Sequence, residues 1–142
     1  RGEGELSDAA AALDWMQKLK PDAQNVWVAG YTFGAWIGMQ LLMRRPEIGG
    51  FFSIGAPANL YDFSFLAPCP SSGLFLHAGQ DEIVTEDSVK KLVEKLRAQR
   101  GIDIDYERIP GATHTFATHL DQMNKSVERY LDRRMAEQSA AA

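Results

Sequence analysis

The sequence has 142 residues, of which 45% are hydrophobic and 24% charged, a composition that suits one globular domain with a hydrophobic core. Its formal net charge is −4 and it has no basic block, which argues against nucleic acid or an anionic membrane as the main partner. The single cysteine, Cys69, excludes an intramolecular disulfide and a cysteine metal cluster, so we expect no metal and no cofactor.

Two further features concern location and domain boundaries. A single cysteine is compatible with a reducing compartment, and the sequence shows no signal segment with a charged start and an apolar core. We therefore expect a cytoplasmic protein. The low-complexity run 136–142 predicts a flexible tail, which leaves residues 1–135 as one domain.

The chain begins with a predicted loop over residues 1–5 and a predicted helix over Ala9–Leu19. Ser7 suits the N-cap of this helix, and Asp8 would lie at its positive end. The apolar residues of the helix can form one stripe that faces the core. They are Ala12, Leu13, Trp15, Met16 and Leu19.

Residues 25–45 form the most informative stretch of the sequence. Val26–Ala29 is short, apolar and rich in β-branched and aromatic residues, which predicts a buried strand. Ala35–Met43 contains good helix formers and is followed by two arginines and a proline, which predict a helix end. Between them stands Gly-Tyr-Thr-Phe-Gly, residues 30–34. A strand, a Gly-x-Thr-x-Gly turn and a helix in this order are the layout of a nucleophile elbow. A side chain at either glycine is expected to collide with the strand and the helix.

Three other interpretations of this stretch are open. Its uncharged run of about 18 residues reaches the lower limit of a membrane span. Gly30, Gly34 and Gly38 repeat at the spacing of a helix-dimerising face. The stretch could also be an ordinary buried strand and helix without chemistry. The β-branched start and the central glycines favour the strand–turn–helix.

The rest of the chain alternates predicted strands and helices. Further strands are expected at 51–54, 73–78 and 102–109, with helices at 85–99 and 118–135 and an ordered loop at 58–72. The core face of the first of these helices consists of Val89, Leu92, Val93 and Leu96. That of the second consists of Leu120, Met123, Val127, Tyr130 and Leu131. This alternation predicts an α/β fold with a parallel sheet and helices on both faces.

Three chemically active side chains each follow a predicted strand end. They are Thr32, Asp81 and His114. In parallel sheets, functional sites gather at the carboxyl ends of the strands. The pattern therefore brings three scattered residues into one candidate site.

These residues occur in the order nucleophile, acid, histidine, within motifs at 30–34, 79–81 and 111–114. The motifs resemble those of the α/β-hydrolase superfamily, and the resemblance extends over nearly the whole chain. Segments 5–10 and 33–43 resemble in particular the small, lidless, bacterial dienelactone-hydrolase-like branch. The resemblance implies hydrolysis of ester or related acyl bonds in a small-molecule substrate, without nucleic acid or membrane.

The resemblance also assigns roles. Thr32 occupies the position of the nucleophile, His114 would remove and return its proton, and Asp81 would hold the imidazole. The backbone N–H of Phe33 would donate to the oxyanion. Family members normally carry Ser where this chain has Thr32, and a β-branched residue is poorly tolerated at the positive φ of an elbow. We therefore expect reduced activity. Four kinds of protein are compatible with a threonine at this position: a slow hydrolase, a natural pseudoenzyme, an engineered trap and an inactive binding module.

Simpler roles remain open for several residues. Asp81 could cap a turn, and His114 could be a core histidine. His77 lies inside a strand and His119 begins a helix, so neither has the expected position. Cys69 lies between prolines and is expected to be a packed thiol. The loop residues Tyr61, Phe63 and Phe65 could line an acyl pocket or simply pack.

The number of predicted strands also departs from the pattern. An α/β-hydrolase sheet commonly has eight strands, and the four predicted here match its carboxyl half. The amino half, which would supply a second oxyanion donor and cover the strand at Val26–Ala29, is expected from missing residues or a second chain. A homo-oligomer is a further option, and a peptidase of the prolyl-oligopeptidase kind is a weaker alternative.

Overall fold

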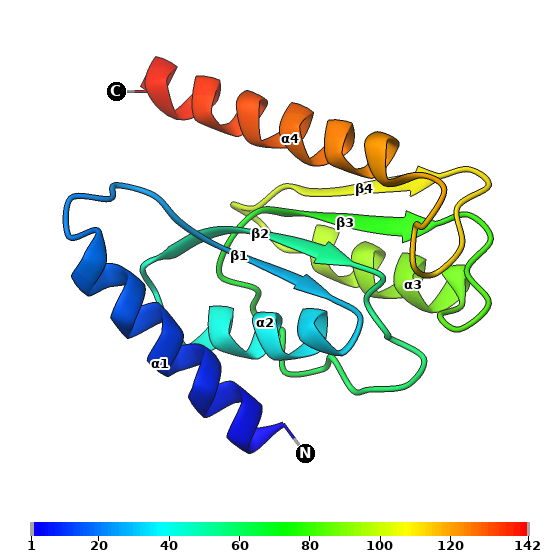
Figure 1. The fold of residues 1–142 in the computed structure, drawn as a ribbon, viewed down its shortest axis with the longest axis horizontal. Helices are drawn as coiled ribbons and strands as arrows, with labels where there is room; N and C mark the ends of the chain where they lie inside the picture. Colours follow the sequence, from blue (N-terminus) through cyan, green and yellow to red (C-terminus); the bar gives the residue numbers. More distant parts are fainter. Residues whose placement is uncertain (1, 142) are drawn as a thin grey trace.

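The computed structural model describes residues 2–141, and its centre is a sheet of four parallel strands. The strands are β1 (Val26–Tyr31), β2 (Ile48–Ile54), β3 (Gly73–Ala78) and β4 (Ile104–Ile109), and they lie side by side in chain order (Figure 1). Every neighbouring pair is parallel. The predicted α/β class and parallel sheet are confirmed.

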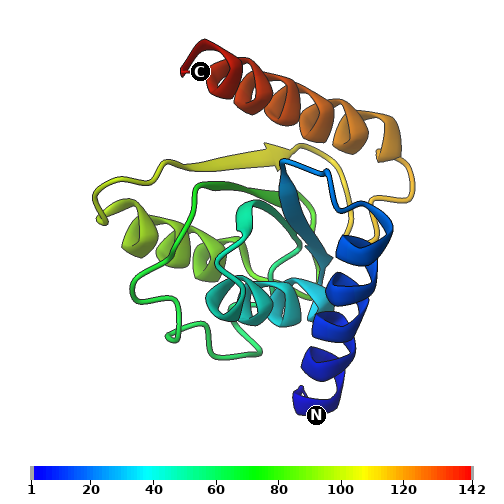
Figure 2. The ribbon, with the colours of Figure 1, turned by 90° about the vertical axis from the view of Figure 1, so that its left-hand side faces the viewer.

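Helices cover both faces of this sheet. α2 (Phe33–Arg44) and α3 (Glu86–Arg97) lie on one face, and α4 (Leu120–Ala141) lies on the other (Figure 1). α1 (Glu3–Leu19) packs against α2 on the β1 side of the sheet (Figure 2). Because successive strand residues point to opposite faces, Phe51 enters the core beneath α2 and α3, whereas Phe52 enters the core beneath α4.

The start of α1 differs from the prediction. α1 begins at Glu3, so the expected loop is wrong for residues 3–5, and Ser7 lies inside the helix rather than at its N-cap. The N–H of Gly2 donates to the carboxylate of Glu5 at 3.2 Å. This contact provides the acceptor at the helix start that the sequence suggested for Ser7.

The apolar stripe predicted for α1 mostly faces solvent. Trp15, Met16 and Leu19 are 59%, 49% and 53% exposed. The face that packs is formed instead by buried Leu6 and the partly buried Ala9, Ala10 and Leu13. The helix has apolar residues on two faces, and its periodicity alone could not show which one the rest of the fold would cover.

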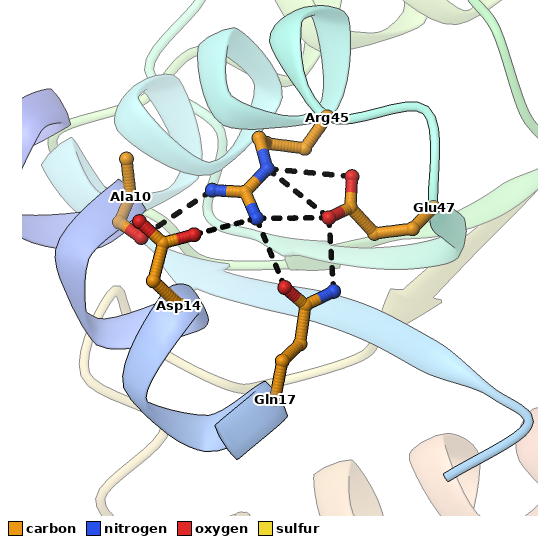
Figure 3. Close-up of polar contacts among 5 residues, drawn as sticks. All are labelled: Ala10, Asp14, Gln17, Arg45 and Glu47. Carbon is orange, nitrogen blue, oxygen red and sulfur yellow. Dashed lines mark hydrogen bonds and ion pairs between the residues drawn. The ribbon is translucent and has the colours of Figure 1, made fainter. Parts of the chain in front are cut away.

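A polar network fastens α1 to the turn between α2 and β2 (Figure 3). The guanidinium of Arg45 contacts Asp14 Oδ1 and Glu47 Oε2, each at 2.8 Å, and donates to Gln17 Oε1 at 3.0 Å and to the carbonyl of Ala10 at 3.4 Å. Gln17 also donates to Glu47 at 2.9 Å. Hydrogen bonds from Arg45 and then Gln17 lower the pKa of Glu47 to about 2.

Replacing Arg45 with Met should lower the Tm by a few degrees, because four acceptors in this network lose their donor. The difference in Tm between the wild type and Arg45→Met should shrink in acid, because the pKa of Glu47 is lowered in the folded protein. The stability that ionised Glu47 contributes is present above pH 4.5, its ordinary pKa, and is lost as the pH falls toward about 2. Thermal unfolding followed by circular dichroism at pH 7 and pH 3 measures both effects. Lys91→Met is the control, because the Lys91–Asp87 pair is at least 75% exposed and should contribute little. Equal Tm values for the two variants would contradict the expectation.

The last two helices match the predicted core faces in most positions. All four predicted residues of α3 are buried. In α4, Tyr130 is buried and Met123, Val127 and Leu131 pack against the core, but Leu120 is 49% exposed, so its inward orientation is wrong. α4 continues to Ala141, so residues 136–141 are helical where a tail was expected; residue 142 lies outside the described residues. The domain boundary at residue 135 stays a prediction.

The uncharged stretch 26–43 is divided between a strand and a helix. Gly30 lies in β1, while Gly34 and Gly38 lie in α2, so both the membrane-span and the helix-dimerisation interpretations are wrong. No helix within residues 2–141 is long and apolar enough to cross a membrane. The loop 58–72 contains no helix or strand, as predicted.

Candidate active site

Thr32 occupies a sharp turn between β1 and α2. Its φ is 49° and its ψ is −116°, which confirms the positive φ expected for an elbow residue. The turn is held from both sides: the N–H of Thr32 donates to the carbonyl of Ile54 at 2.8 Å, and its carbonyl accepts from the N–H of Ala35 at 2.9 Å. A β-branched residue at positive φ is a conformational outlier, and it persists here because neighbouring strand and helix fix the backbone.

The two glycines of the elbow are not equivalent. A Cβ at Gly30 would lie 2.3 Å from the carbonyl oxygen of Gly34 and 2.6 Å from the Cα of Ala35, so β1 and α2 approach too closely for any side chain. A Cβ at Gly34 would meet no heavy atom of residues 2–141 within 4 Å, apart from those of its own helical turn and chain neighbours. The predicted steric requirement is therefore confirmed for Gly30 and wrong for Gly34.

Gly30→Ala should destabilise the protein by about 3 kcal/mol or more, because backbone atoms cannot move aside as a flexible side chain would. Gly34→Ala should be neutral or stabilising by up to about 1 kcal/mol, since alanine favours the helical conformation. Urea unfolding of the two variants tests the pair. A small loss for Gly30→Ala would show that the close approach of strand and helix is not required.

Asp81 and His114 form a buried hydrogen-bonded pair. Asp81 Oδ2 lies 2.8 Å from His114 Nδ1, and the two side chains are 0% and 7% exposed, respectively. Asp81 Oδ1 also accepts from the N–H groups of Ile83 at 2.8 Å and Val84 at 2.7 Å. Asp81 therefore organises the turn after β3 and also contacts the histidine, whereas its role in a triad stays a prediction.

The environment of Asp81 favours its ionised form. Burial alone would raise its pKa, but hydrogen bonds from Val84, His114 and Ile83 outweigh burial and lower it. An ionised carboxylate only accepts hydrogen bonds, so Nδ1 of His114 is the donor in this pair. The lone pair of neutral His114 is then on Nε2, where a general base needs it.

His114 lies over the end of β2, beside the elbow. Its Cε1 atom is 3.4 Å from the position that a Cβ on Gly55 would occupy, and its ring centroid is 5.6 Å from that of Tyr31. Gly55 directly follows Ile54, which binds the N–H of Thr32. The structure thus brings Thr32, Asp81 and His114 to one edge of the sheet. Within residues 2–141, however, no hydrogen bond joins the Thr32 hydroxyl to the imidazole.

The histidine loop is anchored by Phe116, a residue that the sequence did not single out. Phe116 has a φ of 57°, yet it is only 1% exposed and packs in the core beneath α4. Its N–H donates to the carbonyl of Thr113 at 2.9 Å. A bulky residue at positive φ is strained, so burial of its ring holds the loop in a shape that the backbone alone would disfavour.

Phe33 provides the first amide of α2. An α-helix leaves its first N–H groups without acceptors, and no residue within 2–141 accepts a hydrogen bond from this one. The amide directly follows Thr32 and lies at the positive end of the helix dipole. Its position is compatible with the predicted oxyanion role, which stays a prediction.

The sequence and the fold of this chain are similar to those of known proteins. The profile of the dienelactone hydrolase family matches residues 2–140. The chain belongs to this family. An uncharacterized protein of Rickettsia prowazekii is 50% identical over 134 residues, a match that covers 92% of this chain and 56% of that protein.

Solved structures agree with the assignment to the α/β-hydrolase fold. A protein of unknown function from Agrobacterium tumefaciens is 58% identical, with a TM-score of 0.93, over 96% of this chain and 63% of that one. A lidless α/β serine hydrolase from Xanthomonas campestris is 28% identical, with a TM-score of 0.82, over 93% of this chain and 57% of that one. The chain therefore spans less than two thirds of the length of these relatives.

The other candidate residues lie outside the acid–histidine pair. His77 is 1% exposed, burial lowers its pKa, and its Nδ1 has no partner within residues 2–141. His119 contacts Thr118 at 2.8 Å. Cys69 is buried, which raises the pKa of its thiol and disfavours the nucleophilic thiolate.

Of the loop aromatics, Phe63 is buried and Phe65 packs against the core. Tyr61 stacks on Trp36 with ring centroids 4.6 Å apart. For these three residues, packing within the loop and against α2 explains the observed contacts.

Proposed function

We propose that the protein hydrolyses esters or related acyl bonds of small molecules, with Thr32, His114 and Asp81 as nucleophile, base and orienting acid. Membership of the dienelactone hydrolase family supports a hydrolase of the α/β type. The observation that carries the triad is the buried 2.8 Å contact between Asp81 and His114 at the sheet edge where Thr32 forms the elbow.

In the proposed reaction, the Thr32 hydroxyl attacks the acyl carbon and its proton passes to Nε2 of His114. The N–H of Phe33 donates to the resulting oxyanion. The oxyanion collapses, the bond to the alcohol breaks, and His114 returns the proton to the departing oxygen. Water, deprotonated by His114, then attacks the acyl-threonine and releases the carboxylic acid, which restores the Thr32 hydroxyl.

The proposed rate is low because Thr32 is a poor fit to its position. The γ-methyl group restricts rotation about χ1, and the backbone of Thr32 has the positive φ that β-branched residues rarely adopt. The absence of a hydrogen bond between Thr32 and His114 also favours a second candidate, an inactive module that keeps the fold and binds ligands. Hydrolysis of p-nitrophenyl acetate by the wild type, Thr32→Ser and His114→Ala distinguishes the candidates; an active Thr32→Ser variant supports the hydrolase.

We further propose that the active protein includes a partner for the free edge of β1, supplied by another part of the same polypeptide or by a second chain. β1 lies at the edge of the sheet, and its residues are half-buried or exposed although most are apolar. The same segment would supply the second oxyanion donor. Cytoplasmic location and a homo-oligomeric state stay predictions from the sequence.

A further inference from the structure

We propose that Tyr31 is a positioning residue, which ties the histidine loop to the nucleophile elbow. Its hydroxyl donates to the backbone carbonyl of His114 at 2.9 Å. Its ring also lies beside the imidazole, with centroids 5.6 Å apart and planes inclined by 33°. This inference rests on the proposed function, because the geometry it controls is that between Thr32 and His114.

His114 is held by three different side chains. Asp81 binds Nδ1 of the ring at 2.8 Å, and Glu82 accepts from the backbone N–H at 3.4 Å. Both of these residues belong to the turn after β3. Tyr31 completes the set by binding the carbonyl, and it is the last residue of β1, directly before Thr32.

This position gives Tyr31 a role that the other two residues lack. Within residues 2–141, its hydroxyl makes the hydrogen bond that directly joins elbow residues 30–34 to loop residues 110–119. Asp81 and Glu82 fix His114 relative to β3, whereas Tyr31 fixes the same residue relative to the elbow. Because base and nucleophile must meet within hydrogen-bond reach, a small displacement of the loop should reduce the rate strongly.

The hydroxyl is suited to serve as a permanent donor. Partial burial raises the pKa of Tyr31, and the negative charges of Asp81 and Glu82 raise it further. The group therefore stays protonated throughout the range in which a histidine base titrates. Tyr31 as a whole is 41% exposed, so removal of its hydroxyl oxygen leaves no cavity in the core.

The test compares Tyr31→Phe with Tyr61→Phe, each in wild-type and Thr32→Ser forms of the full natural polypeptide that carries these residues. Tyr61 is similarly exposed, at 38%, but its ring contacts Phe33 and Trp36 rather than His114. In the Thr32→Ser form, Tyr31→Phe should lower kcat about tenfold with KM unchanged. Tyr61→Phe should leave both kcat and KM unchanged.

A second readout does not need turnover. In protein labelled with ¹⁵N-histidine, the Nδ1–H resonance of His114 should shift or broaden in Tyr31→Phe, while Tyr61→Phe leaves this resonance unaltered. A changed resonance with no hydrolysis by any variant supports the positioning role and refutes the proposed function. An unchanged Nδ1–H resonance of His114 in Tyr31→Phe overturns the positioning role, whatever the esterase assay shows.

Discussion

Thr32→Ser should raise kcat for p-nitrophenyl acetate by about 100-fold. The backbone of residue 32 is held at a φ of 49° by hydrogen bonds to Ile54 and Ala35, so it cannot relax to suit a β-branched side chain. Serine keeps the hydroxyl, loses the methyl group and regains freedom at χ1, so its oxygen can turn toward His114. Conformational strain of this kind costs about 1–3 kcal/mol, and a hundredfold rate change corresponds to about 2.7 kcal/mol.

The measurement is the initial rate of p-nitrophenol release, with Thr32→Ala and Thr32→Ser/His114→Ala as inactive controls. Labelling with a fluorophosphonate, followed by peptide mass spectrometry, should place the adduct on residue 32 of Thr32→Ser. If Thr32→Ser is no faster than Thr32→Ser/His114→Ala and carries no adduct, the hydrolase interpretation fails and the binding module gains support.

Asp81→Asn, in the Thr32→Ser form, should lower kcat by about 10³- to 10⁴-fold. Asn can keep an oxygen acceptor for the N–H groups of Ile83 and Val84, so the turn after β3 should survive. Its NH₂ group would then face Nδ1 of His114 and favour the tautomer with the proton on Nε2, which removes the base. The main effect should therefore appear in kcat, and the loss of stability at neutral pH should be smaller than that caused by Asp81→Ala.

Asp81→Ala separates the structural role of this carboxylate from its proposed catalytic role. It removes the acceptors of two backbone N–H groups as well as the contact to His114, so the free energy of unfolding should fall by about 1–3 kcal/mol beyond that of Asp81→Asn. Asp81 has a lowered pKa in the folded protein, so its contribution is present above its ordinary value of 3.8 and is lost as the pH falls through the folded value. Urea unfolding between pH 7 and pH 3 should show the wild type converging on Asp81→Asn. A pH-independent gap between them would contradict this account.

The parts of the fold that were predicted correctly depend on local patterns. β3 was expected at residues 73–78 and is observed there, and α3 buries its four predicted residues. Local patterns could not decide between the two apolar faces of α1, because the choice depends on how α2 and the sheet pack against it. Leu120 and Met16 were misplaced for the same reason: their exposure reflects which surfaces other elements cover, and periodicity does not encode this.

In the candidate site too, some residues could be predicted from local patterns and others could not. Thr32, Asp81 and His114 could be grouped from the sequence because each follows a strand, and the carboxyl ends of parallel strands share one edge. Tyr31 and Phe116 could not be recognised, because their roles depend on contacts with segments remote in the chain; the Tyr31–His114 bond spans 83 residues. The spare room at Gly34 is likewise a property of packing that the Gly-x-Thr-x-Gly pattern does not contain.

The strand order of the sheet has a consequence for biosynthesis. Each strand pairs with the one translated immediately before it, so the sheet can grow by addition at a single edge while the ribosome is still moving. β1, α2 and β2 can associate and shape the turn around Thr32 before the codon for His114 has been read. Under the proposed mechanism, we expect a nascent chain to have the turn around Thr32 formed but unreactive. It should gain reactivity only when the last loop emerges and His114 contacts Asp81, 33 residues earlier in the chain.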